Sequence, residues 1–123
     1  MAVVDFLVVG QGLAGTVLAW RLRERGARVL VIDREEGPNS SRVAGGLITP
    51  ITGRQLAKSW RIDESWPVAR SFYREMESRL GCSFFHELPV ARIFRGEEEL
   101  SRWTAKRDRP EVEAYLSRQL GEG

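Results

Sequence analysis

Residues 3–15 read VVDFLVVGQGLAG, a short apolar run rich in β-branched side chains that leads into three glycines. Such a run is typical of a strand buried on both faces. Leu13, Val17 and Leu22 then recur near a helical period, which predicts a helix over residues 13–25 that stops at Gly26. Residues 28–32, RVLVI, predict a second buried strand. Two such strands joined by one helix make a parallel βαβ unit over residues 2–33, so the sequence predicts an α/β fold.

The three glycines form a GxGxxG pattern at the turn from the predicted strand to the predicted helix. In a dinucleotide-binding unit Gly10 makes the tight turn, Gly12 lets the backbone approach a pyrophosphate, and Gly15 lets helix and strand pack closely. The phosphates then meet the first amides of the helix, at Leu13 and Ala14, where the helix dipole favours negative charge. The alternative is a glycine-rich turn in an ordinary α/β domain.

A carboxylate stands where the second strand ends. Asp33 follows Gly10 by 23 positions, the place at which a dinucleotide site needs an acceptor for the adenosine ribose hydroxyls. Its charge would repel the extra phosphate of NADP, so Asp33 favours FAD or NAD. The adjacent Arg34 is a cation and leaves NADP open.

Beyond the unit, residues 34–54 are dense in turn formers and predict an ordered loop. Apolar residues at three- and four-residue steps predict a helix over 63–80, with Pro67 in its first turn and Gly81 just past its end. Residues 83–86 and 90–94 are predicted to be short strands, and residues 97–106 and 110–120 are predicted to be helices. The expected domains are residues 1–54 and 55–123. Four aromatic residues could line a pocket but are expected to be core: Trp60, Trp66, Phe72 and Tyr73.

The segment 39–48, NSSRVAGGLI, lies a few residues after the acidic strand end. It resembles the Ser/Thr-rich stretch followed by Ala-Gly in FAD-dependent oxidoreductases of the D-amino acid oxidase and glycine oxidase family. The resemblance implies that Ser40 and Ser41 approach the pyrophosphate. It also implies that four residues lie beside the flavin ring: Ala44, Gly45, Gly46 and Leu47. Without the family, the same segment is an exposed flexible loop.

The resemblance further implies what the whole protein does. The expected fold is a Rossmann-type FAD-binding βαβ unit with parallel strands, followed by helices and short strands that enter a substrate domain. The expected reaction is oxidation of the C–N bond of an amine or amino acid by hydride transfer to flavin. Some relatives attach FAD covalently through a histidine at the place of Val43, so non-covalent FAD is expected here.

Family members are longer than 123 residues and place their catalytic groups in a later part of the chain. We therefore expect a truncated fold, inactive alone, and no catalytic acid or base is predicted. Two other functions remain open at this point. One is an NAD-dependent dehydrogenase or reductase, and the other is a non-catalytic nucleotide-binding module.

Composition excludes several classes of protein. The formal net charge of +2 is too small to indicate nucleic acid as a partner. A single cysteine, Cys82, excludes an internal disulfide framework and fits a cytoplasmic protein, and CxxC or Cys/His metal spacing is absent from the sequence. No run approaches the ~18 apolar residues of a membrane span. The lone histidine, His86, is expected to be structural or on the surface.

Overall fold

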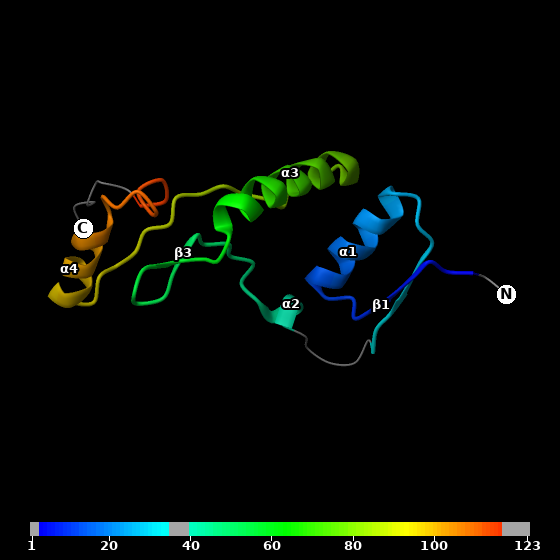
Figure 1. Ribbon diagram of the computed structural model, residues 1–123, viewed down its shortest axis with the longest axis horizontal. Coiled ribbons are helices and arrows are strands. Elements are labelled where there is room, and N and C mark those ends of the chain that lie inside the picture. The colour runs from blue at the N-terminus through cyan, green and yellow to red at the C-terminus, as the bar shows by residue number, and fades with distance from the viewer. Residues whose placement is uncertain (1–2, 35–39, 117–123) are drawn as a thin grey trace. The chain divides into compact units, whose positions relative to one another are not determined.

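The computed structural model describes residues 3–34 and 40–116. Contacts divide the chain into two units, residues 1–48 and residues 49–123. The order of elements along the chain can be followed in Figure 1. A domain boundary at residue 54 stays a prediction.

The first unit is built on a parallel pair of strands, as predicted. Strand β1, Phe6–Val9, pairs with β2, Val29–Ile32, and α1, Leu13–Glu24, connects them. The register aligns Phe6 with Val29 and Val9 with Ile32. At the start of the pair, Asp5 accepts hydrogen bonds from the backbone and the guanidinium of Arg28. These bonds lower the pKa of the Asp5 carboxyl. Because Asp5 and Arg28 directly precede the two strands, the bonds also help to hold β1 and β2 in register.

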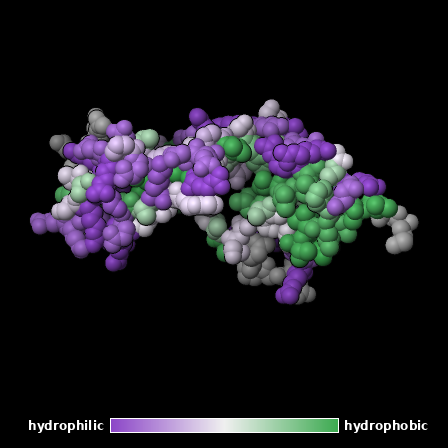
Figure 2. Space-filling view, viewed as in Figure 1, coloured by the Kyte–Doolittle hydropathy of each residue, from purple (hydrophilic) through white to green (hydrophobic). Residues whose placement is uncertain are grey.

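The two faces of this sheet differ in exposure. Val8 of β1 and Ala19 of α1 are buried where the helix packs on the strands. Because side chains alternate along a strand, every second residue of β1 and β2 points to the opposite face of the sheet. Four side chains on that face are close to half exposed or more: Leu7 (55%), Val9 (77%), Leu30 (47%) and Ile32 (46%). Figure 2 shows hydrophobic residues gathered over the part of the chain that holds β1 and α1.

The segment predicted as a loop contains regular elements. Residues 35–39 lie outside the described residues, but Ser40–Val43 form the short helix α2. Further on, β3, Ile51–Thr52, pairs antiparallel with β4, Ala57–Lys58. The prediction of an ordered loop over residues 34–54 is therefore wrong at residues 40–43 and 51–52. Elements of two to four residues are too short to show a period in the sequence.

The second unit contains a long helix that the sequence predicts well. Helix α3 runs Ile62–Leu80 and ends at Gly81, whose φ of +64° is the left-handed conformation that suits a helix stop. Phe72 and Met76 are buried on one face of α3. Pro67 is the sixth residue of the helix and not part of its first turn, so this detail of the prediction is wrong.

The rest of the second unit is less regular than predicted. Residues 82–95 contain no strand, which corrects the strands expected at 83–86 and 90–94. A strand needs a partner for its backbone groups, and in this segment side chains of α3 supply many of the contacts instead. Helix α4, Glu97–Lys106, is confirmed. Residues 110–116 form successive turns instead of the predicted helix, and residues 117–120 lie outside the described residues.

Candidate functional site

The glycine loop between β1 and α1 has the backbone shape that the GxGxxG pattern requires. Gly10 has a φ of +96°, a conformation that side chains disfavour, and its amide donates to the carbonyl of Ile32 over 2.8 Å. This bond joins the end of β1 to the end of β2. Gly12 is extended and is the N-cap residue of α1, so the first amide of the helix belongs to Leu13.

Space around the other two glycines is limited by different neighbours. A Cβ atom on Gly15 would lie 1.9 Å from the carbonyl oxygen of Gly10, so any larger residue would force the helix away from the loop. A Cβ on Gly12 would lie 3.1 Å from Oγ of Ser41. Gly15 is thus required for packing, whereas a side chain at Gly12 would crowd the Ser41 hydroxyl at the start of α1.

Two side chains from later segments reach the amides of this loop. The Asp33 carboxylate accepts a hydrogen bond from the amide of Gln11, and Ser41 Oγ accepts one from the amide of Leu13 over 3.0 Å. The acceptors lie 22 and 28 residues further along the chain than their donors. The structure therefore brings together the glycines, Asp33 and Ser41, which the sequence singled out separately.

The other predicted site residues lie nearby in the sequence. Arg34 directly follows Asp33 and is exposed, as are Ala14 on the first turn of α1 and Ser40 at the start of α2. The stretch after α2 is also exposed, and Gly46 within it has a φ of +67°. It contains the four residues predicted beside the flavin: Ala44, Gly45, Gly46 and Leu47.

Sequence reasoning missed two residues, one in the glycine loop and one at the start of α1. Gln11 supplies the amide that Asp33 binds, and its carbonyl accepts a hydrogen bond from the Thr16 hydroxyl over 3.3 Å. Gln11 contributes only backbone atoms to these contacts, so its side-chain identity carries no signal. Thr16 is a polar residue in the first turns of α1, which is the only hint the sequence offers.

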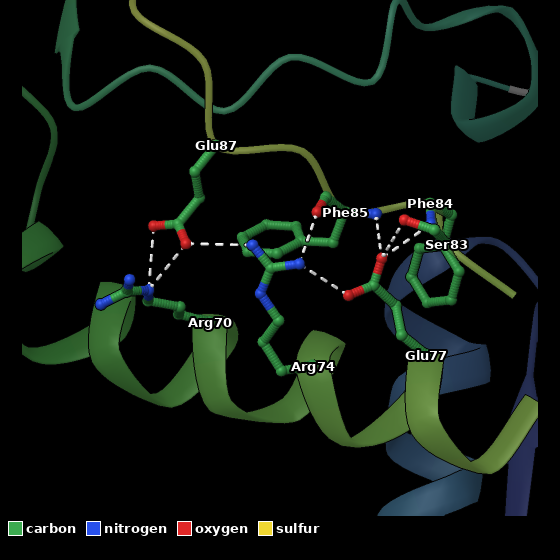
Figure 3. Close-up of polar contacts among 7 residues, drawn as sticks. All are labelled: Arg70, Arg74, Glu77, Ser83, Phe84, Phe85 and Glu87. Atoms are coloured by element: carbon green, nitrogen blue, oxygen red, sulfur yellow. Dashed lines mark hydrogen bonds and ion pairs between the residues drawn. The ribbon is translucent and has the colours of Figure 1, made fainter. Parts of the chain in front are cut away.

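A second polar cluster surrounds Glu77 of α3, as Figure 3 shows. One carboxylate oxygen of Glu77 accepts from the amides of Phe84 and Phe85, each over 2.8 Å, and from the Ser83 hydroxyl. The other accepts from Arg74 over 2.8 Å. These bonds, led by that from Phe85, lower the pKa of Glu77 to about 2. The cluster fixes the segment after α3 to the helix.

Arg74 extends this cluster to Glu87. Its guanidinium donates to the Phe85 carbonyl over 2.9 Å, lies 5.0 Å from the centre of the Phe85 ring and pairs with Glu87 over 3.1 Å. Arg70 also pairs with Glu87, and the hydrogen bond from Arg74 is the main cause of a lowered Glu87 pKa. Every polar atom named in this cluster has a protein partner, so its evident role is structural.

Most of the predicted core aromatics lie beside this cluster. Phe72 is buried, and Tyr73 stacks on Phe85 with ring centres 5.2 Å apart, while Trp66 lies 6.0 Å from the same ring. Trp60 is 86% exposed, so its assignment to the core is wrong.

A smaller group ties together three segments of the second unit. Asp63 of α3 accepts a hydrogen bond from the Tyr115 hydroxyl over 2.6 Å and pairs with Lys58 of β4 over 2.5 Å. The bond to Asp63 raises the pKa of Tyr115, and the bond from Lys58 is the main cause of a lowered Asp63 pKa. All three side chains are again satisfied by one another.

The chain belongs to a family of flavin-dependent redox enzymes. Residues 5–122, nearly the whole chain, match the family described as FAD dependent oxidoreductase. The match confirms the family resemblance that residues 39–48 indicate. The parallel pairing of β1 and β2 confirms the Rossmann-type α/β fold.

Individual relatives differ in their named activities. The uncharacterized oxidoreductase YurR of Bacillus subtilis is 26% identical over 118 residues, which cover 94% of this chain and 30% of the relative. A KsdD-like steroid dehydrogenase of Mycobacterium tuberculosis is 37% identical over 127 residues, covering 96% of this chain and 18% of the relative. A thiamine thiazole synthase of Aeropyrum pernix is 42% identical over 55 residues, covering 44% of this chain and 20% of the relative. The chain thus spans less than a third of the length of these relatives.

No solved structure matches the chain significantly. Within residues 3–34 and 40–116, no helix is both long enough and apolar enough to cross a membrane.

Proposed function

We propose that the first unit binds FAD without a covalent bond, with its pyrophosphate at the N-terminus of α1. The observation that supports this most directly is the meeting of Asp33 and Ser41 at the glycine loop in a member of an FAD-dependent family. Loop amides, a helix N-terminus and a missing Cβ at Gly12 fit a pyrophosphate, and a strand-end carboxylate fits ribose hydroxyls. These features support binding of the ADP part of FAD by this chain.

Each predicted residue has a role in this proposal. Gly10, Gly12 and Gly15 shape the loop, and the amides of Leu13 and Ala14 face the phosphates. Asp33 accepts from the ribose, with Arg34 beside it. Ser40 and Ser41 lie near the pyrophosphate. The backbone of residues 44–47 runs beside the flavin, because small residues allow close approach to a planar ring. Val43 cannot form a covalent link to the flavin.

For the whole protein we propose oxidation of the C–N bond of an amine or amino acid. Bound FAD would accept the hydride, while the residues of this chain hold and orient the cofactor and exclude NADP through Asp33. The steroid dehydrogenase among the relatives makes a steroid the alternative substrate class. An NAD-dependent enzyme is the weaker alternative, because the family is described by its dependence on FAD.

Flavin binding tests the proposal directly. The purified chain, incubated with FAD and passed through a desalting column, should retain the flavin absorbance bands. Gly12→Val should abolish retention, because its side chain fills the space at the start of α1. Gly96→Val is the matched control, since a Cβ there meets no atom within 4 Å. Retention by Gly12→Val equal to that of the wild type would refute the proposed site, and release of the flavin by acid precipitation would confirm that it is not covalent.

A further inference from the structure

We propose that Thr16 is a positioning residue of the FAD site. Its hydroxyl orients the peptide that joins Gln11 to Gly12 and so directs the Gly12 amide toward the pyrophosphate. The inference rests on the proposed function, because it concerns the same glycine loop. It assigns a role to a side chain outside the GxGxxG pattern that acts through the backbone of the loop.

Thr16 lies at the start of α1 and holds two neighbouring carbonyl groups of the glycine loop. Its amide donates to the carbonyl of Gly12 over 2.9 Å, which is the first hydrogen bond of the helix. Its hydroxyl donates to the carbonyl of Gln11 over 3.3 Å. That carbonyl precedes the N-cap residue, so it lies outside the ladder of helical hydrogen bonds. The side chain of Thr16 thus supplies a donor that the helix backbone does not.

Gln11 is held from its other side by Asp33. The Asp33 carboxylate accepts from the Gln11 amide, so the two backbone groups of this residue are fixed by two different segments. The peptide between Gln11 and Gly12 is trans, and in a planar trans peptide the N–H and the C=O point in opposite directions. Because the Gln11 carbonyl points toward Thr16, the Gly12 amide points away from Thr16.

The Gly12 amide differs from its neighbours in its partners. The amides of residues 10, 11 and 13 each donate to an acceptor in a later segment, and these acceptors are Ile32, Asp33 and Ser41. Within residues 3–34 and 40–116, the Gly12 amide donates to no protein group. A phosphate oxygen can therefore accept from Gly12 without breaking a bond within the protein, and the Thr16 contact sets the direction of this amide.

Titration of the 123-residue chain with FAD, followed by flavin fluorescence, tests the role of the hydroxyl. Thr16→Val keeps the shape and the β-branching but removes the donor, so it should bind FAD about three- to tenfold more weakly than the wild type. Thr16→Ser keeps the donor and should bind FAD within about twofold of the wild type. Thr104→Val is the matched control, because it removes a hydroxyl bond to the Leu100 carbonyl of α4 and should leave FAD binding unchanged.

The outcomes separate the inference from the proposed function. Equal binding of FAD by Thr16→Val and the wild type would overturn the inference and leave the proposed function standing. A loss in Thr16→Ser as large as that in Thr16→Val would also overturn it, because the methyl group and not the hydroxyl would then matter. A wild-type chain that binds no FAD would refute the proposed function and the inference together.

Amide NMR of the wild-type chain tests the orientation without any substitution. Saturation with FAD should shift the Gly12 amide signal more than that of Gly26, whose amide donates to the Arg23 carbonyl at the other end of α1. A Gly12 signal that stays in place in the FAD-saturated chain would overturn the inference, even if Thr16→Val does not fold.

Discussion

The two units of the chain are stabilised by different kinds of contact. In residues 3–34 and 40–48 a parallel strand pair and one helix meet through backbone hydrogen bonds and close packing at Gly15. In residues 49–116 the helix α3 holds an irregular segment through side-chain groups, above all the Glu77 carboxylate. The first kind of contact follows from short patterns in the sequence. The second depends on pairs of residues with no recognisable spacing.

The largest loss of stability is expected at Gly15, where the first unit has no space for a side chain. Gly15→Val places a side chain against the Gly10 carbonyl, since even a Cβ would lie 1.9 Å from that oxygen. We expect a loss of about 3 kcal/mol in the free energy of unfolding, at the upper end of overpacking effects. Hydrogen exchange should show the loss first in β1, α1 and β2.

Ala14→Val is the control for Gly15→Val. It adds a β-branched residue at an exposed position of the same helix and should cost less than about 1 kcal/mol. Equal destabilisation by both variants would show that helix propensity, and not the approach of α1 to the glycine loop, limits the stability of the first unit.

A smaller effect is expected at the turn between β3 and β4. Leu56 is only 2% exposed and has a φ of +49°, which is unusual for a residue other than glycine. Lys106 of α4 donates to the carbonyl of the preceding residue, Gln55. Leu56→Ala should therefore lower the free energy of unfolding by about 2 kcal/mol, the low end for a buried leucine.

The control for this variant is an exposed leucine. Leu88→Ala, at a residue that is 75% exposed, should change the free energy of unfolding in urea by less than about 0.5 kcal/mol. Similar effects of Leu56→Ala and Leu88→Ala would show that the hairpin turn contributes little packing to the second unit.

The same difference between the units explains how far the sequence could predict the structure. The apolar runs and the helical period of residues 3–33 predicted β1, α1 and β2, and the period around Phe72 and Met76 predicted α3. Residues 90–94 have the composition of a strand, but composition supplies no partner, and the structure shows none for them within its described residues. The meeting of Glu77 with the backbone of Phe84 and Phe85 had no sequence signal, because a carboxylate on a helix usually faces water.

The candidate site shows the same limit on a smaller scale. The glycines and Asp33 could be found from residue type and spacing, since the backbone geometry of a βαβ unit brings them to one end of the strands. The bond of Ser41 to the Leu13 amide could not, because it joins two residues 28 positions apart whose contact no spacing or residue type specifies. Spacing alone predicts which residues are near the loop, and only the structure shows which amide each one binds.

The smallest expected effect concerns Glu77, and it depends on pH. Glu77→Gln keeps the size of the side chain but removes the charge that Arg74 and two amides bind, so it should lower Tm at neutral pH. The folded pKa of about 2 lies below the ordinary value of 4.5. Folding therefore favours the ionised form, and the stabilisation is fully present above about pH 4.5 and is lost as pH falls towards about 2.

The pH dependence separates this cluster from an ordinary surface ion pair. The difference in Tm between wild type and Glu77→Gln should be constant from pH 7 to pH 5 and should shrink between pH 4.5 and pH 2. Glu75→Gln removes the same charge from the same helix, where it pairs with Arg79 over 2.6 Å, and should change Tm less because that pair binds no backbone amide. A difference for Glu77→Gln that persists unchanged to pH 2 would mean that shape, and not charge, holds residues 83–87 on α3. The second unit would then resemble the first, in which packing and backbone hydrogen bonds stabilise the fold.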